Sequence, residues 1–112
     1  MIEYGFFSKK NIFLIFLILF FGILSSIIVS IFTPKNPFKN EKKRIYVVYG
    51  FGLKKISNEL YKNNLIRNKK IFELFVILSG NHKKLKAGEY EFKLSESIFT
   101  ITQKMVKGDV IS

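Results

Sequence analysis

The chain is short, strongly basic and free of cysteine: it has 112 residues, a formal net charge of +11 and one histidine. Without cysteine it can form neither disulfides nor thiolate-based zinc or redox sites, and His82 alone cannot build a metal site. We therefore predict no metal and no cofactor. The length leaves room for one small domain beside any membrane segment.

Ile12 to Phe32 is a run of 21 residues without a charge. As an α-helix it would be about 31 Å long, which matches the roughly 30 Å hydrocarbon core of a bilayer. A buried core helix would need more protein around it than about 80 further residues supply. A signal peptide has a shorter apolar core, and no Ala-x-Ala cleavage site follows here. We predict a single uncleaved transmembrane helix.

The charges that flank this run do not fix its orientation. Lys9 and Lys10 precede it, and five basic residues follow between residues 33 and 44. Counted by the positive-inside rule, they put the C-terminal side in the cytoplasm, but the rule weakens when a folded domain follows. Orientation is therefore open at this point.

Residues 33–43 are predicted to be a linker, because two prolines end the helix and polar residues surround them. The soluble part, residues 44–112, begins with Arg44 to Tyr49. This run is rich in β-branched and aromatic residues and predicts a strand. Gly50-Phe51-Gly52 then predicts a turn.

Two helices are predicted next. Apolar residues spaced three and four apart from Leu53 to Leu60 indicate the first helix, which Asn63-Asn64 ends. Asn68 can cap the second helix, Lys69 to Ser79, and Gly80-Asn81 closes it.

The last third of the chain predicts one more strand and one more helix. Apolar and polar residues alternate from Glu89 to Leu94, which indicates a strand with one buried face. Ser95 or Ser97 caps a third helix that ends at Gly108. Asp109 to Ser112 has the composition of the first residues of another strand.

The predicted fold class is therefore α+β, in the order β-α-α-β-α after the membrane helix. A two-stranded sheet alone is marginal, so the helices must supply most of the burial. The predicted core residues are Ile45, Val47, Ile56, Leu60, Ile66, Phe72, Phe75, Val76, Leu85, Tyr90, Phe92, Ile101 and Met105.

The sequence contains no recognisable catalytic constellation. A Ser/His/Asp set cannot be argued from His82 and Asp109 alone. Glu89 and Glu91 fall on the water-facing side of their strand and are interpreted as solubilising, since paired carboxylates for sugar chemistry need a cleft. Gly50-x-Gly52 lacks the third glycine and the Lys-Ser/Thr of the phosphate-binding loops, so a tight turn explains it.

A helix-turn-helix over Leu53 to Leu78 would suit the basic charge, but the second helix is dominated by isoleucine, leucine and phenylalanine. It offers almost no side chain that could read base edges. We predict no nucleic-acid partner.

Five pieces in fixed order carry a resemblance to a known family. The most telling is Leu85-Lys86-Ala87-Gly88-Glu89-Tyr90, which is similar to that family's Leu-x-Ala-Gly-x-Tyr strand. The others are Ile45 to Tyr49 before Gly50, Ile56-x3-Leu60, Asn64-Leu65-Ile66 followed by Phe72, and Ser97 with Val106-Lys107-Gly108. In this pattern residues 44–112 resemble the N-terminal region of the endolytic murein transglycosylase family (MltG/YceG).

The resemblance implies a fold and an activity. The N-terminal region of the family is a LysM-like module, and LysM modules bind N-acetylglucosamine-containing glycans. The family's enzymes cleave nascent peptidoglycan strands by intramolecular transglycosylation, outside the plasma (inner) membrane. That implies residues 1–11 in the cytoplasm and the module on the periplasmic or outer side. The family's catalytic glutamate belongs to a following domain, so we predict no catalytic residue here and expect a truncated member.

Two hypotheses about function follow. In the first, the chain is the membrane-anchored part of a lytic transglycosylase and meets peptidoglycan glycan strands through its exposed loops, Gly50 to Gly52 and Asn81 to Lys86. The candidate substrate-binding residues are Lys83, Lys84 and Lys86, on the argument that loops carry function in small scaffolds. In the second, the anchored module is non-catalytic and binds peptidoglycan or a protein of the cell-wall synthesis machinery.

Overall fold

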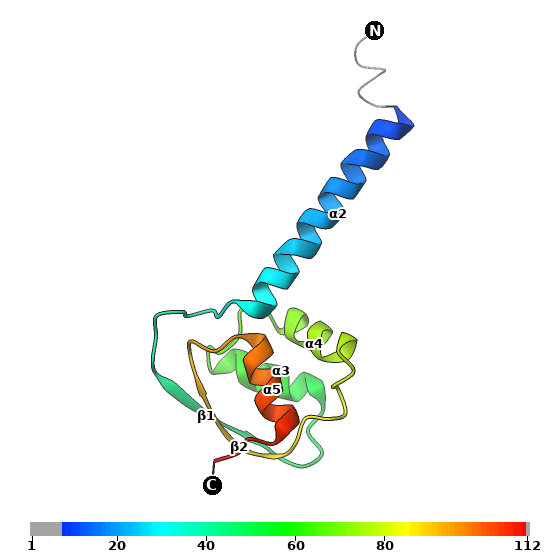
Figure 1. The fold of residues 1–112 in the computed structure, drawn as a ribbon. Coiled ribbons are helices and arrows are strands. Elements are labelled where there is room, and N and C mark those ends of the chain that lie inside the picture. Colours follow the sequence, from blue (N-terminus) through cyan, green and yellow to red (C-terminus); the bar gives the residue numbers. More distant parts are fainter. Residues whose placement is uncertain (1–7, 112) are drawn as a thin grey trace.

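The computed structural model describes residues 8–111, in which a long helix leads into a small α+β module (Figure 1). The order expected of a LysM-like module followed by a third helix is confirmed. Residues 1–7 of the predicted tail, and Ser112 of the predicted last strand, lie outside the described residues. The elements are α2 (Lys9–Phe32), β1 (Lys42–Val47), α3 (Leu53–Lys62), α4 (Lys69–Leu78), β2 (Gly88–Lys93) and α5 (Ile98–Lys107).

Helix α2 has 24 residues and begins after Ser8, whose side chain accepts a hydrogen bond from the backbone N–H of Asn11. It is long and apolar enough to cross a membrane, and none of its most apolar 18-residue window is buried against the module. A core helix of a soluble domain would bury that window, so the structure argues against this alternative.

The last turn of α2 is the part that contacts the module. Ile31 is buried there, and the ring of Phe32 lies 5.1 Å from the ring of Phe99 on α5. The Phe99 ring lies in turn 6.2 Å from that of Phe75 on α4. These contacts fix the direction of α2 relative to the module.

The segment after α2 is hydrogen-bonded to the turn between α3 and α4. The Lys35 ammonium donates to the side-chain oxygen of Asn64, and the Asn36 amide donates to the Asn64 carbonyl at 3.1 Å. The Arg67 guanidinium donates to the Pro34 carbonyl at 3.0 Å. The start of the predicted linker is thus attached to the module and is not a free tether, and its last two residues, 42 and 43, already belong to β1.

Strands β1 and β2 pair antiparallel, with Lys42 opposite Lys93 and Val47 opposite Gly88. On the outer face Arg44 lies 3.2 Å from Glu89 and 3.7 Å from Glu91. Both glutamates face water as predicted, and each has a cationic partner on β1. These exposed pairs contribute at most about 1 kcal/mol each.

The two strands begin and end earlier than predicted. The prediction of β1 over Arg44 to Tyr49 was wrong at its end, because a turn closed by a 3.0 Å hydrogen bond from Phe51 N–H to the Val48 carbonyl stops the strand at Val47. Gly50, with φ of +95°, lies in that turn. Tyr49 therefore lies outside the sheet, with 94% of its surface exposed.

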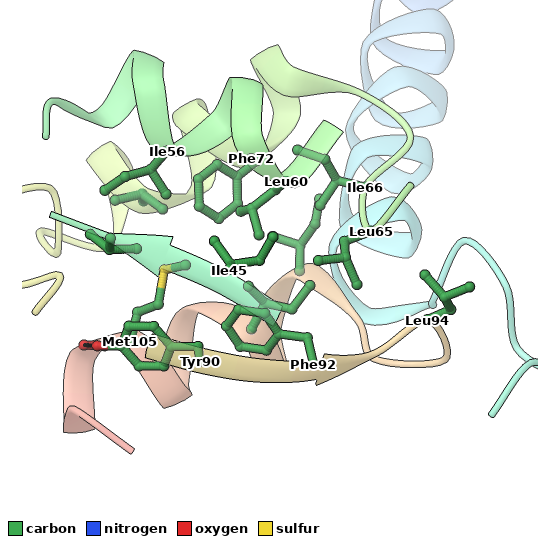
Figure 2. Close-up of a cluster of buried hydrophobic side chains, with 14 of the residues drawn as sticks. Ile45, Ile56, Leu60, Leu65, Ile66, Phe72, Tyr90, Phe92, Leu94 and Met105 are labelled. Carbon is green, nitrogen blue, oxygen red and sulfur yellow. Dashed lines mark hydrogen bonds between the residues drawn. The ribbon is translucent and has the colours of Figure 1, made fainter. Parts of the chain in front are cut away.

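Most of the predicted core residues pack together in one cluster, to which both the strands and the helices contribute (Figure 2). Of the predicted members, only Phe75 and Leu85 are partly buried, because Phe75 lies beside Phe99 at the α2 junction and Leu85 lines a surface groove. The buried hydrophobic residues of the module also include three that were not predicted: Leu65, Leu94 and Ile98.

The helix ends follow the predicted caps. Asn64 takes a positive φ of 64° after α3, and the Asn68 side chain accepts the backbone N–H groups of Lys70 and Ile71. Ser97, and not Ser95, caps α5.

The predicted strand over 109–112 is not formed in its described part, 109–111. A 2.8 Å hydrogen bond from Val110 N–H to the Gly108 carbonyl keeps the chain in a turn, and only Ile111 bonds to β2, through the Glu89 carbonyl at 2.8 Å.

Candidate functional site: an open groove beside Tyr49

Of the two predicted binding loops, only Asn81 to Lys86 lines an open groove, of about 470 Å³; none of the residues 50–52 is among its lining residues. Lys83, Lys84 and Lys86 line it from one side, and Tyr49, the residue before Gly50, lines it from the other. Leu85, Ala87 and Val106 complete the lining. We call this surface the Tyr49 groove. Sequence reasoning selected the three lysines but missed Tyr49, which it had assigned to the strand.

One buried tyrosine holds the backbone of the groove residue Lys86 in place. The Tyr90 hydroxyl donates to the Lys86 carbonyl at 2.6 Å and lies 3.4 Å from the Met105 carbonyl. The Lys86 N–H donates to the same Met105 carbonyl at 3.0 Å. Burial raises the pKa of Tyr90 above its usual value near 10, and the carboxylate of Asp109 raises it further. Tyr90 therefore stays a neutral donor at physiological pH and fixes the loop to α5.

Two glycines permit this close packing. Gly88 has φ of +148°, and a Cβ placed on it would lie 2.3 Å from Cγ1 of Val110. Gly108 has φ of +73°, and a Cβ there would lie 2.7 Å from Cδ of Lys86. Glycine is thus required at the start of β2, where Val110 lies close, and after α5, where the Lys86 side chain lies close.

The lining of the Tyr49 groove suits binding and not acid–base chemistry. Its lining residues include no carboxylate, and the three ammonium groups can only donate hydrogen bonds. The exposed ring of Tyr49 adds a flat apolar face with a polar tip. A ligand with both flat apolar faces and many oxygen acceptors fits such a surface, and sugars have both.

The least exposed carboxylate among the ion pairs of the described residues is that of Glu96, which the sequence did not single out. It pairs with the Lys104 ammonium at 2.6 Å and accepts the backbone N–H of Lys93 at 3.3 Å. It therefore ties α5 to the end of β2, and this arrangement is structural. In the described part of the chain, no three His, Asp or Glu residues gather as a metal site would require.

A second open surface lies along the outer face of α3. Lys54, Lys55, Asn58 and Lys62 line it, together with Tyr61, whose ring lies 5.3 Å from the Lys69 ammonium. This surface is basic, but it was not selected from the sequence.

The comparison with known families adds to this geometry. The sequence profile of the YceG-like family matches residues 45–112, a range that begins inside β1 and includes all the later elements. The chain belongs to the YceG-like family.

One solved structure supports this assignment. The chain is similar to a crystal structure of a YceG-like protein, lmo1499, from Listeria monocytogenes, with 29% sequence identity and a TM-score of 0.60. The match covers 64% of this chain and 23% of the Listeria chain, so the chain corresponds to about a quarter of that protein. No curated protein matches the chain.

Proposed function

We propose that this chain is the membrane-anchored N-terminal part of an endolytic peptidoglycan lytic transglycosylase that cleaves nascent glycan strands during cell-wall assembly. The observation that carries the proposal is the match of the YceG-like family over the whole module, 45–112. Because the chain corresponds to only 23% of the Listeria protein, bond cleavage is assigned to a catalytic domain outside these residues. The chain itself anchors the enzyme and orients the glycan.

The anchor in this proposal is α2. Its 24 residues span about 36 Å as a helix, which exceeds the roughly 30 Å hydrocarbon core. The contacts of Ile31 and Phe32 with the module hold the module at a fixed angle to the helix. A glycan bound to the module would therefore be presented at a defined height above the membrane.

The glycan site in this proposal is the Tyr49 groove. Figure 1 places the end of β1 and the loop before β2, which build the groove, on the side of the module away from α2. A strand of peptidoglycan could reach this side without meeting the membrane. The exposed Tyr49 ring would stack on a sugar, and Lys83, Lys84 and Lys86 would donate to its oxygens.

Sedimentation with purified peptidoglycan tests the groove. The triple variant of Lys83, Lys84 and Lys86 to alanine, and separately Tyr49→Ala, should each lose most of the bound fraction. The charge-matched control replaces Lys54, Lys55 and Lys62, on the outer face of α3, by alanine and should keep it. An unchanged bound fraction in both groove variants would overturn the glycan site and favour a module that binds a protein of the cell-wall synthesis machinery.

The side of the membrane is tested by reporters fused after Ser112. The proposal requires the module on the periplasmic or outer side of the plasma (inner) membrane, where nascent peptidoglycan lies. A reporter that is active only outside the cytoplasm supports it, and one active only in the cytoplasm would contradict both the orientation and the assigned substrate.

A further inference from the structure

The outer face of α4 carries apolar side chains that the core does not use. Phe72 and Val76 point into the core and are fully buried. On the outer side Leu74, Ile77 and Leu78 are exposed by 42%, 51% and 76%. A helix in water normally carries polar residues on such a face.

This exposed face is continuous with the membrane-spanning helix. Ile71, Leu74, Phe75 and Leu78 follow the spacing of one helical stripe. The stripe reaches α2 through Phe75, whose ring lies 6.2 Å from Phe99, and Phe99 lies 5.1 Å from Phe32 in the last turn of α2. Figure 1 shows α4 beside this end of α2, at the same level.

The charges around the stripe fit a lipid surface. Lys70 is exposed at the start of α4, where a long basic side chain can reach toward anionic headgroups while Leu74 and Leu78 enter the acyl boundary. Amphipathic helices that lie in the interface bury their apolar face by about 5–10 Å. Because α2 is longer than the hydrocarbon core, its last turn reaches this zone.

We propose that the outer face of α4, with Phe99, lies in the headgroup and acyl boundary of the bilayer, so that the module rests on the membrane that α2 crosses. The inference rests on the proposed anchor. It gives the module a second membrane contact, which turns the Tyr49 groove away from the lipid surface and limits rotation of the module about α2.

Depth-dependent fluorescence quenching tests this placement. The sequence contains no cysteine, so single cysteines can be introduced and labelled in the full chain, reconstituted in vesicles that contain anionic lipid. Three positions are compared: Leu78→Cys on α4, Leu19→Cys in the middle of α2, and Asn58→Cys on the outer face of α3. Nitroxide groups on the lipids quench labels that reach them, either near the headgroup or deep in the acyl chains.

We expect the Leu78 label to be quenched strongly by the shallow nitroxide, the Leu19 label by the deep one, and the Asn58 label by neither. Quenching at Leu19 without quenching at Leu78 would overturn the placement of α4 and leave the anchor intact. Quenching at Leu78 alone would support the lipid contact and overturn the transmembrane anchor, and quenching at neither would overturn both. A Leu78 label with blue-shifted emission but no quenching by lipid would indicate a second copy of the chain over α4 and overturn the lipid assignment.

A charge introduced into the stripe gives an independent test. Leu74→Asp should reduce the quenching of a label at Leu78 severalfold, because a carboxylate resists entry into the acyl boundary. Asn58→Asp adds the same charge to the outer face of α3 and should leave that quenching unchanged. Equal quenching in both variants, with helical content retained, would contradict the proposal.

Discussion

Helices α3 and α4 have the same length of ten residues and bury side chains in the same hydrophobic core, yet their outer faces are opposite in character. The outer face of α3 is polar and charged, with Lys54, Lys55 and Asn58 exposed. The outer face of α4 is apolar. Packing of a helix on this core therefore does not require an apolar outer face. Core packing alone does not explain the exposed leucines of α4.

The same contrast separates the two sides of the module. The side that meets α2 is closed by aromatic rings, those of Phe32, Phe75 and Phe99. The side with the Tyr49 groove is held by hydrogen bonds from Tyr90 and from the Lys86 backbone. The exposed leucines of α4 suit lipid and the exposed lysines of the Tyr49 groove suit water, which agrees with the proposed position of the module on the membrane.

The largest expected effect is the difference in free energy of unfolding between substitutions on the buried and the exposed face of α4. Phe72→Ala removes a fully buried ring and should lower the free energy of unfolding by about 3–5 kcal/mol. Leu74→Ala, on the exposed face of the same helix, should change it by about 0.5 kcal/mol or less in detergent micelles. Urea unfolding followed by circular dichroism measures both, and equal costs would mean that Leu74 is part of the core after all.

The next effect concerns the link between the two helices. The buried Ser57 hydroxyl on α3 donates to the Glu73 carboxylate on α4 at 2.9 Å. Ser57→Ala should cost about 1–2 kcal/mol, since the acceptor is charged. A double-mutant cycle with Glu73→Ala should give a coupling energy of about 1 kcal/mol. A coupling near zero would show that the two helices are held together by the core alone.

Tyr90→Phe tests the groove side. It should cost about 1 kcal/mol at pH 7, because the hydrogen bond to the Lys86 carbonyl is lost. The raised pKa of Tyr90 means that the fold retains the phenol proton above pH 10 while the unfolded chain releases it. The stabilisation that the parent chain gains from the Tyr90 phenol is thus fully present below about pH 10 and declines above it.

The difference in free energy of unfolding between the parent chain and Tyr90→Phe should therefore shrink as the pH rises above about 10. Urea titrations from pH 7 to pH 11 measure it, with Tyr61→Phe, at a half-exposed tyrosine of α3, as the control. A difference between the parent and Tyr90→Phe that is the same at all pH values would contradict the role assigned to burial.

The smallest effect concerns the starts of the two helices. Asn68 accepts the backbone N–H groups of Lys70 at 2.8 Å and Ile71 at 3.2 Å, so Asn68→Ala should cost about 1 kcal/mol. Gly52, at the start of α3, has no side chain to offer and has open space at its Cβ position. Gly52→Ser should stabilise the module by a few tenths of a kcal/mol. Thermal unfolding measures both, and a destabilising Gly52→Ser would show that the turn itself requires glycine.

Much of the fold follows from local patterns. The spacing of Ile56 and Leu60, the cap at Asn68 and the alternation through Tyr90 and Phe92 each predict the element that the structure shows. The end of β1 was wrong, because the turn bond between Phe51 and Val48 competes with strand pairing and no pattern in the strand itself reports it. The candidate site was predicted in part: Lys83, Lys84 and Lys86 came from their loop, whereas Tyr49 joined them only when the turn removed it from the strand.

The sequence by itself determined the uncharged run of α2, the α+β order and the resemblance to the YceG-like family, because these depend on which residues follow one another. Tertiary structure alone decided that the end of α2 is attached to the module and that Tyr49 faces the basic loop. It also decided which face of α4 is left exposed. Those features depend on contacts between residues far apart in the chain, such as Phe32 with Phe99 or Asn36 with Asn64. Neither spacing nor composition encodes which of two apolar faces the core will bury.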